Sequence, residues 1–277
     1  MTPKNQLKEI EKDKNNQHLL IVTGFSCNNN CILCSLRPQA VIHNDKTTQE
    51  IENMLKSAAK KFSVVEFTGG EPTIRKDLCR LIRCAKKLGF KKIAISTNGR
   101  LLSYKSFLDK LIDAGLNRVT LTLYSHSELI HNSITRTPES FQQTVSGIYN
   151  LIQRSDIELS VNTVICRLNY QSLNETGMFL RKIGVKKWGL LDLIPFGNAE
   201  RFYSGLAVKM KDLSSALNKL TEIINDFYSI TFFDFSTCLF DDKLKKYPQA
   251  DFFDAWGRAD NFQQVGYNHK RFHLGKG

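Results

Sequence analysis

The chain has 277 residues, of which 42% are hydrophobic and 24% are charged. This composition is typical of a globular domain, and the length suits one α/β barrel or two smaller domains. No apolar run approaches the roughly 18 residues of a membrane span, and residues 1–17 lack the apolar stretch of a secretory signal. We therefore expect a protein of the cytoplasm that has no membrane partner.

The formal net charge of +12 reflects 39 Lys and Arg residues against 27 Asp and Glu residues. Such an excess can attract an acidic partner, for example a nucleic acid or an acidic peptide. The lysines are spread along the chain in pairs near the ends of expected helices, where cations complement the helix dipole. This spread favours solvated helix ends and leaves nucleic-acid binding open.

Short β-rich runs alternate with amphipathic helices along the chain. Several runs are almost continuously apolar, as in parallel strands covered on both faces. Such alternation is typical of βαβ units in an α/β fold. We expect a partial (β/α)6 barrel of parallel strands with helices outside, and a doubly wound sheet is the alternative. The expected strands are 18–24, 63–68, 92–96, 118–123, 157–165 and 187–194.

Local signals mark the helix starts. Thr47 and Glu50 have the spacing of a capping box. Thr137 as the N-cap and Pro138 at the first helical position predict the start of another helix. The last long helix has its apolar stripe at Leu213, Leu217, Leu220, Ile224 and Phe227.

We expect one domain with two extensions. Residues 18–228 form the core, residues 1–17 an N-terminal extension, and residues 229–277 a C-terminal extension. The aromatic and basic end of the chain suits a lid over the barrel, a contact with peptide or nucleic acid, or a frayed tail. The short first segment predicts no separate domain for peptide recognition.

The chemistry of parallel α/β folds lies at the carboxyl ends of the strands, and Cys27, Cys31 and Cys34 directly follow the first one. A structural zinc site needs four protein ligands. Cys79 and Cys84 lie beside the apolar stripe of a helix and do not supply a second pair. Three soft thiolates with a fourth position open suit an iron–sulfur cluster.

This CxxxCxxC loop resembles the defining motif of the radical S-adenosylmethionine (SAM) superfamily, and the resemblance covers roughly residues 18–200. It implies one 4Fe–4S cluster and SAM, whose methionine part chelates the open iron. Reductive cleavage of SAM then yields a 5′-deoxyadenosyl radical that takes hydrogen from a substrate. It also implies an external reductant of the flavodoxin or ferredoxin type. Leu33 stands where the family often has an aromatic residue.

Further segments resemble the SAM-binding elements of that family. The turn after the second strand resembles the GGEP element that binds the SAM amino group, with Glu71 as the carboxylate. Arg136 is the expected partner of the SAM carboxylate, because a guanidinium is a two-pronged donor. The expected cofactor-binding residues are Gly69, Gly70, Glu71, Pro72, Thr97, Asn98, Thr122, Arg136, Asn162, Ile194 and Gly197.

Cys166 and Cys238 are candidate catalytic residues that donate a hydrogen atom to a substrate radical. Each is also a small apolar residue suited to a core. After residue 200 the chain has only Cys238, and one cysteine cannot hold a second cluster. For His126 and His131 the structural interpretation is favoured over a catalytic one.

The substrate is less determined than the reaction class, because one fold carries many reactions. Similarity to stand-alone peptide-modifying members favours a peptide. A small metabolite or a nucleoside is the alternative. Two other classes are a non-catalytic iron–sulfur electron carrier and a zinc protein that binds nucleic acid.

Overall fold

In the computed structural model, which describes residues 18–36, 44–253 and 262–265, the strands form a single parallel sheet. Their order is β8-β7-β6-β5-β4-β3-β2-β1-β9. The strands are β1 (His18–Val22), β2 (Val64–Thr68), β3 (Lys92–Thr97), β4 (Arg118–Thr122), β5 (Glu158–Val164), β6 (Lys187–Leu191), β7 (Ser229–Phe233), β8 (Ala250–Phe253) and β9 (Phe262–Val265).

The expected partial barrel is confirmed. The six predicted strands are β1 to β6, and they lie in the sheet in their chain order. A doubly wound sheet would reverse its order at a switch point among the core strands, whereas β1 to β8 follow one another without a reversal and β9 lies on the other side of β1. The sheet is not closed, because β8 and β9 stand at its two ends.

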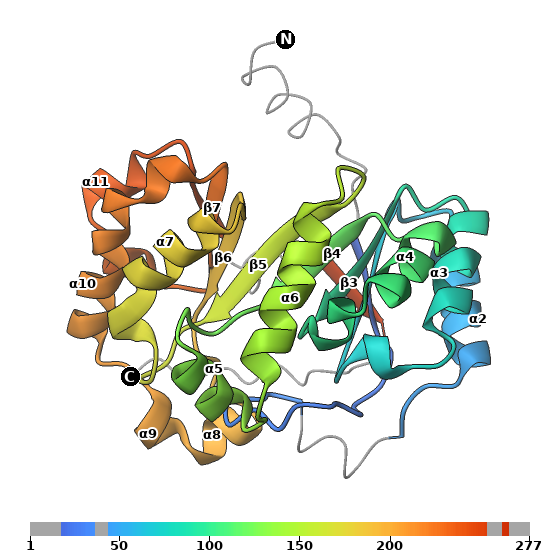
Figure 1. Ribbon diagram of the computed structural model, residues 1–277, viewed down its shortest axis with the longest axis horizontal. Coiled ribbons are helices and arrows are strands. Elements are labelled where there is room, and N and C mark those ends of the chain that lie inside the picture. The colour runs from blue at the N-terminus through green and yellow to red at the C-terminus, as the bar shows by residue number, and fades with distance from the viewer. Residues whose placement is uncertain (1–17, 37–43, 254–261, 266–277) are drawn as a thin grey trace.

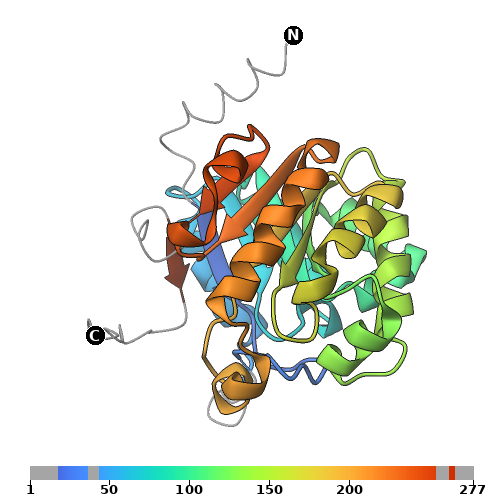
Figure 2. The same ribbon diagram turned by 90° about the vertical axis from the view of Figure 1, so that its left-hand side faces the viewer.

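Helices cover the outer face of the curved sheet (Figures 1 and 2). None of those that the structure describes is long and apolar enough to cross a membrane. The helices are α2 (Thr48–Ala58), α3 (Leu78–Lys87), α4 (Lys105–Ala114), α5 (Glu128–Thr135), α6 (Ser140–Ile152), α7 (Leu173–Lys182), α8 (Asn198–Arg201), α9 (Tyr203–Leu206), α10 (Met210–Asn218) and α11 (Asp242–Lys245).

The capping box of α2 is confirmed, since Thr47 and Glu50 exchange both hydrogen bonds. The predicted start of α6 at Thr137 and Pro138 is wrong. The helix begins at residue 140 after Glu139, which has a left-handed backbone with φ of 61°. The backbone N–H of Phe141 donates to Oδ1 of Asn132 at 2.9 Å. A cap from the preceding helix thus replaces the local one.

The predicted last long helix is shorter than its apolar stripe. Helix α10 ends at Asn218, and two 3-10 turns, Lys219–Glu222 and Ile224–Asp226, continue the path. All five residues of the stripe are buried. The apolar stripe therefore predicts correctly which side is buried, although the α-helix ends after Asn218 and the tighter 3-10 turns follow.

The described part of the C-terminal extension belongs to the sheet. Strand β7 pairs with β6, β8 pairs with β7, and β9 pairs with β1 at the opposite edge. Residues 1–17, and most of the residues expected to form a lid, lie outside the described residues.

Alternation along the strands separates an apolar outer face from a polar inner one. On β5, Val161 is fully buried in the core against the helices, whereas Glu158, Ser160 and Asn162 line a hollow inside the sheet. This hollow has a volume of about 250 Å³ and is lined by residues of β2, β4, β5, β6 and β7. The sheet thus encloses a polar interior, which leaves room for ligands rather than a packed core.

A charge cluster joins four strands at their amino ends, opposite the cysteine loop. Both oxygens of the Glu158 carboxylate are used: Lys187 lies at 2.7 Å, Arg118 at 2.9 Å and Lys92 at 3.3 Å. Burial by itself raises the pKa of Glu158, but the hydrogen bonds and positive charges of these neighbours outweigh it and lower the pKa to about 2. The carboxylate therefore holds three cations together at the base of the barrel.

Replacing this carboxylate is expected to weaken the barrel. Glu158→Gln should lower the free energy of unfolding at pH 7 by about 2 kcal/mol, because three cations lose their shared partner. The folded-state pKa lies below the ordinary 4.5, so the contribution is present above pH 4.5 and disappears as the pH falls toward 2. Denaturant unfolding at several pH values measures both effects.

Glu175→Gln is the matched control, because Glu175 is exposed in the first turn of α7. It should change stability by less than about 0.5 kcal/mol. Equal stabilities of the wild type and Glu158→Gln at pH 7 would contradict the role given to the charge cluster.

Candidate functional site

The loop that carries the three cysteines lies at the carboxyl edge of the sheet, directly after β1. In Figure 1 this blue segment runs beside α5 and α8. Cys27, Cys31 and Cys34 are partly buried, and no cysteine of the chain forms a disulfide. The structure therefore keeps three thiols in one loop at the edge where parallel α/β folds place their chemistry.

The three thiols lie close enough together that Cys27 and Cys34 shift the pKa of Cys31. Burial raises the pKa of Cys31 to about 12, a hydrogen bond from Tyr124 opposes the rise, and Cys34 and Cys27 add to it. Metal binding requires the thiolate forms, so loading such a site releases protons.

The donor set fits a cluster. In an iron–sulfur cluster each thiolate binds its own iron. Three soft thiolates in one loop suit such a cluster, whereas a structural zinc ion takes four protein ligands.

The glycines after β2 let the cysteine loop approach the backbone. Gly69 has φ of 130°, a region that favours glycine. A Cβ atom at Gly69 would overlap the carbonyl oxygen of Gly24, and one at Gly70 would overlap that of Ser26. The space above both glycines is filled by the start of the cysteine loop.

Two backbone hydrogen bonds close this contact. The N–H of Gly70 donates to the carbonyl of Gly24 at 2.9 Å, and the N–H of Glu71 donates to that of Ser26 at 2.8 Å. On the other side of the loop, Oδ1 of Asp45 accepts from the N–H of Phe25 at 2.6 Å. The loop is therefore held from both sides before its first cysteine.

The Glu71 carboxylate ties the turn after β2 to the turn after β3. Its Oε1 accepts from the N–H and hydroxyl of Thr73 and from the hydroxyl of Thr97, at 3.0, 2.5 and 2.6 Å. Its Oε2 accepts from the N–H of Asn98 at 2.7 Å. The side chain is 3% exposed, and burial raises its pKa although these hydrogen bonds oppose the rise. Glu71, Thr97 and Asn98 thus meet at one point, as expected from the sequence, but through bonds among themselves.

The turn after β3 reaches the cysteine loop directly. Nδ2 of Asn98 donates to Oδ1 of Asn28 at 2.7 Å. Arg100 donates to the carbonyl of Asn28 and, at 3.0 Å, to Oδ1 of Asn29. Sequence analysis missed Asn28 and Arg100, although Arg100 directly follows the Asn-Gly turn.

The segment after β6 holds the far end of the loop. Gly197 has φ of 66°, and a Cβ there would overlap the carbonyl of Ser35. Asn198 donates from its N–H to the carbonyl of Cys34 at 2.9 Å and from Nδ2 to that of Cys31 at 3.0 Å. Gly197, which the sequence analysis gives as a cofactor contact, therefore lies against the cysteine loop, and the contacts of Asn198 were not foreseen.

Arg136 ends α5 close to the loop and is exposed. The neighbouring carbonyl of Thr135 accepts from the N–H of Asn30 at 3.0 Å. The guanidinium of Arg136 lies 5.2 Å from the ring centre of Phe202, and that of Arg201 lies 5.3 Å from the same ring. Two cations on one aromatic ring thus flank the cysteine loop.

The remaining expected contacts lie on the strands or just beyond their ends. Thr122, the last residue of β4, and Asn162, which lies inside β5, are register partners, and Asn162 lines the interior hollow. Pro72 is buried at the start of a 3-10 turn. Ile194, beyond β6, is 39% exposed.

The two other candidate cysteines differ in their surroundings. Cys166 is fully buried in an apolar cluster that also includes Leu33 and borders Cys31. Cys238 is exposed in a 3-10 turn whose Leu239 carbonyl accepts from Asn218 of α10. The structure thus packs Cys166 beneath the cysteine loop and leaves Cys238 outside the residues gathered there.

His131 and His126 make polar contacts within the fold. Nδ1 of His131 accepts from the N–H of Tyr124 at 3.2 Å, and burial lowers the pKa of His131 to about 4. His126 contacts the hydroxyl of Thr176 at 3.3 Å.

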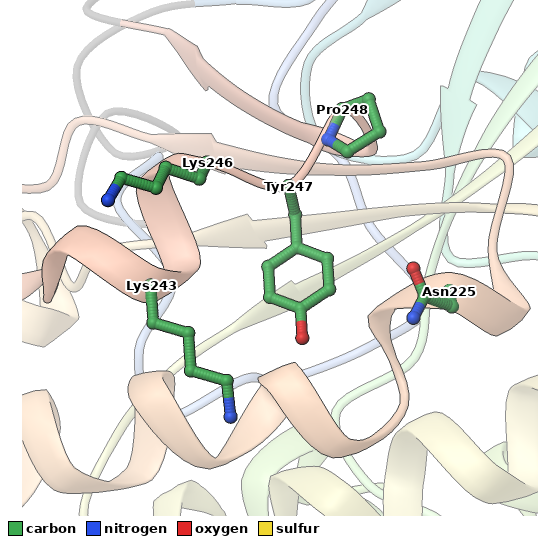
Figure 3. A pocket seen from close by; sticks show the side chains of 5 residues that line it. All are labelled: Asn225, Lys243, Lys246, Tyr247 and Pro248. Atoms are coloured by element: carbon green, nitrogen blue, oxygen red, sulfur yellow. The ribbon is translucent and has the colours of Figure 1, made fainter.

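A larger surface hollow, of about 550 Å³, lies elsewhere. Figure 3 shows the side chains that line this hollow. Its walls come from Asn225, Lys243, Lys246, Tyr247 and Pro248. None of these residues belongs to the strand ends that hold the cysteine loop, so we do not place the site there.

The sequence and the fold both have known relatives. Residues 21–180 match the family model described as the radical SAM superfamily. A probable GTP 3′,8-cyclase of Sulfolobus acidocaldarius is 31% identical over 215 residues, which cover 76% of this chain and 67% of that protein. One of Saccharolobus solfataricus is 30% identical over 183 residues, which cover 65% of this chain and 58% of that protein. The match to this chain therefore spans about three fifths to two thirds of these relatives.

Solved structures share the fold at low identity. SuiB of Streptococcus suis has a TM-score of 0.62 and 17% identity, covering 90% of this chain and 52% of that one. The structure of anSMEcpe with bound SAM has a TM-score of 0.62 and 18% identity, covering 77% of this chain and 64% of that one.

A side chain at the turn after β2 is expected to displace the cysteine loop. Gly70→Ala should lower the free energy of unfolding by about 2 kcal/mol, because its Cβ overlaps backbone that cannot rotate away. Less iron should also be retained after anaerobic reconstitution. Thermal unfolding and iron analysis measure the two effects.

Gly205→Ala is the matched control, because nothing lies within 4 Å of a Cβ added at Gly205. It should retain iron and change stability by less than about 0.5 kcal/mol. If Gly70→Ala behaves like this control, the close approach at Gly70 is not needed for the loop.

Proposed function

Because this chain belongs to the radical SAM superfamily and is an enzyme of that family, we propose that Cys27, Cys31 and Cys34 hold one 4Fe–4S cluster. With this cluster the enzyme cleaves SAM and draws a hydrogen atom from a substrate. The observation that carries this proposal is the binding of the cysteine loop by the segments after β2, β3 and β6 and by the end of α5. Membership of the family argues against a non-catalytic electron carrier and a zinc protein.

When bound, the cluster supplies the electron that breaks a carbon–sulfur bond of SAM. The residues of the chain hold the loop, keep water from Cys31 and orient SAM. Of the proposed SAM contacts, Thr122 and Asn162 offer a hydroxyl and an amide on neighbouring strands, and Arg136 offers a guanidinium to the carboxylate.

The structure refines the part proposed for Glu71. Its Oε1 already accepts three hydrogen bonds and its Oε2 accepts one. A carboxylate oxygen has about two lone pairs, so Oε2 retains acceptor capacity for an ammonium group. We infer that Glu71 mainly fixes the turns after β2 and β3, and that the remaining acceptor capacity of its Oε2 contributes to binding the SAM amino group.

An electron must come from outside the chain, and we propose a reductant of the flavodoxin or ferredoxin type. Such small acidic carriers suit the net charge of +12. None of the seven cysteines is in a disulfide, and we propose a reducing compartment such as the cytoplasm.

For the substrate we propose a purine nucleotide as the first candidate. The two sequence relatives at 30–31% identity are named as probable GTP 3′,8-cyclases. Arg201, beside Phe202, also places a positive charge next to the segment that holds the cysteine loop, which suits a phosphate, while Arg136 is kept for the SAM carboxylate. The relatives extend beyond the matched part, so the ring closure itself does not transfer to this chain.

A peptide is the second candidate, as the sequence analysis favoured. One fold relative, SuiB, is known in complex with its precursor peptide SuiA, and another, anSMEcpe, in complex with peptides. These likenesses, at 18–19% identity, concern the fold alone.

Removing any one of the three ligands is expected to abolish the reaction. Cys27→Ala, Cys31→Ala and Cys34→Ala should each lower the rate of 5′-deoxyadenosine formation by more than about 100-fold, since an open cluster needs all three thiolates. Anaerobically reconstituted wild type should hold about four iron and four sulfide per chain.

Cys79→Ala and Cys84→Ala are the matched controls, since both cysteines lie on α3 away from the loop. They should keep the iron and the activity. A wild type that binds no iron, or that binds iron and never cleaves SAM under strong reductant, would overturn the proposal.

The substrate class is tested by measuring 5′-deoxyadenosine formation in the presence of each candidate. Nucleoside triphosphates are expected to raise 5′-deoxyadenosine formation by about tenfold or more, with deuterium passing from labelled nucleotide to SAM-derived product. Arg201→Ala should raise the KM for the nucleotide, and Arg83→Ala on α3 should not. Stimulation by a candidate peptide and by no nucleotide would favour the second candidate.

A further inference from the structure

Tyr124 reaches the cysteine loop from the end of β4. Its phenol oxygen lies 3.8 Å from Sγ of Cys31, within hydrogen-bond range for the large sulfur atom. The side chain is 9% exposed. A phenol is a donor at neutral pH, so the thiolate form of Cys31 has an O–H group directed at it.

The backbone of Tyr124 is held on both sides by buried polar side chains. Its N–H donates to Nδ1 of His131 at 3.2 Å, and its carbonyl accepts from Nδ2 of Asn169 at 2.8 Å. His131 and Asn169 are each 1% exposed. Burying two polar side chains is costly, and both bind the backbone of this one residue. The backbone position from which the phenol reaches Cys31 is therefore held on both sides.

The phenol and the thiol meet in apolar surroundings. Tyr124 belongs to a buried cluster that borders Cys31. The other buried members are Leu33, Ile134, Cys166, Leu193, Ala199 and Leu206. In a medium of low dielectric constant a hydrogen bond to a charged sulfur is stronger than in water, and few water molecules compete for it.

We propose that Tyr124 is a positioning residue that donates a hydrogen bond to the Cys31 ligand of the cluster and thereby raises the reduction potential of the cluster. The inference rests on the proposed cluster site. Reduction adds negative charge to the cluster and its sulfurs, so a donor stabilises the reduced form more than the oxidised form. The external reductant then transfers its electron more readily than it would without the phenol.

The test is the midpoint potential of the reconstituted cluster in the absence of SAM, measured by an anaerobic titration followed by electron paramagnetic resonance. Tyr124→Phe keeps the ring and removes only the hydroxyl. It should hold as much iron as the wild type, and the equilibrium constant for one-electron reduction should fall by about tenfold, which corresponds to about 59 mV.

A second variant shifts the potential the other way. Replacing Tyr124 alone by 3-fluorotyrosine gives a more acidic phenol and a stronger donor, so the potential should rise. This variant keeps the hydroxyl and the ring, and it tests the inference even if Tyr124→Phe fails to fold. Tyr149→Phe is the control, because Tyr149 is 48% exposed on α6, and its potential should equal that of the wild type.

The outcomes separate the two proposals. A wild type without iron overturns the cluster site itself. A wild type with iron, together with potentials that change in neither Tyr124 variant, overturns only the hydrogen bond. Opposite shifts in the two variants support it.

Discussion

Two backbone hydrogen bonds, from Gly70 and Glu71 to the carbonyls of Gly24 and Ser26, join the cysteine loop to the end of β2. They form only because two glycines leave room for a second backbone where side chains would stand. The path of the loop before Cys27 is set by this contact. The start of the loop depends on it, and Arg100 and Asn198 hold the residues that follow, so the placement proposed for the thiols rests on these contacts together.

Around this contact, hydrogen bonds from partly or fully buried polar groups hold the cysteine loop and the neighbouring turns together. Glu71 links the turns after β2 and β3, and Arg100 and Asn198 bind carbonyls of the cysteine loop. Each bond replaces water at a group that burial would otherwise leave unsatisfied. The loop is thereby shaped by the ends of several strands. Such preorganisation is what a site needs if it is to bind a labile cofactor and exclude water.

Polar residues gather at both ends of the barrel, and their roles differ between the two ends. At the amino ends of the strands, Glu158 binds three cations and closes the base. At the carboxyl ends, polar side chains and backbone groups surround the cysteine loop. Between them lies a hollow lined by alternate strand residues, including Thr120 and Asn162. The same alternation that buries the outer face against the helices thus supplies an interior for ligands.

The sequence by itself determined the order of the six core strands and the place of the three cysteines after the first of them, because periodicity and dense motifs are local signals. It also placed Glu71 and Gly197 near the site. Only the tertiary structure decided what they touch: the partners of Glu71 lie up to 27 residues away, and Asn198 bonds a carbonyl 167 residues away. Tyr124 and Asn28 were missed for the same reason. A hydrogen bond between distant residues has no local pattern, and even the start of α6 was determined by Asn132 of another helix.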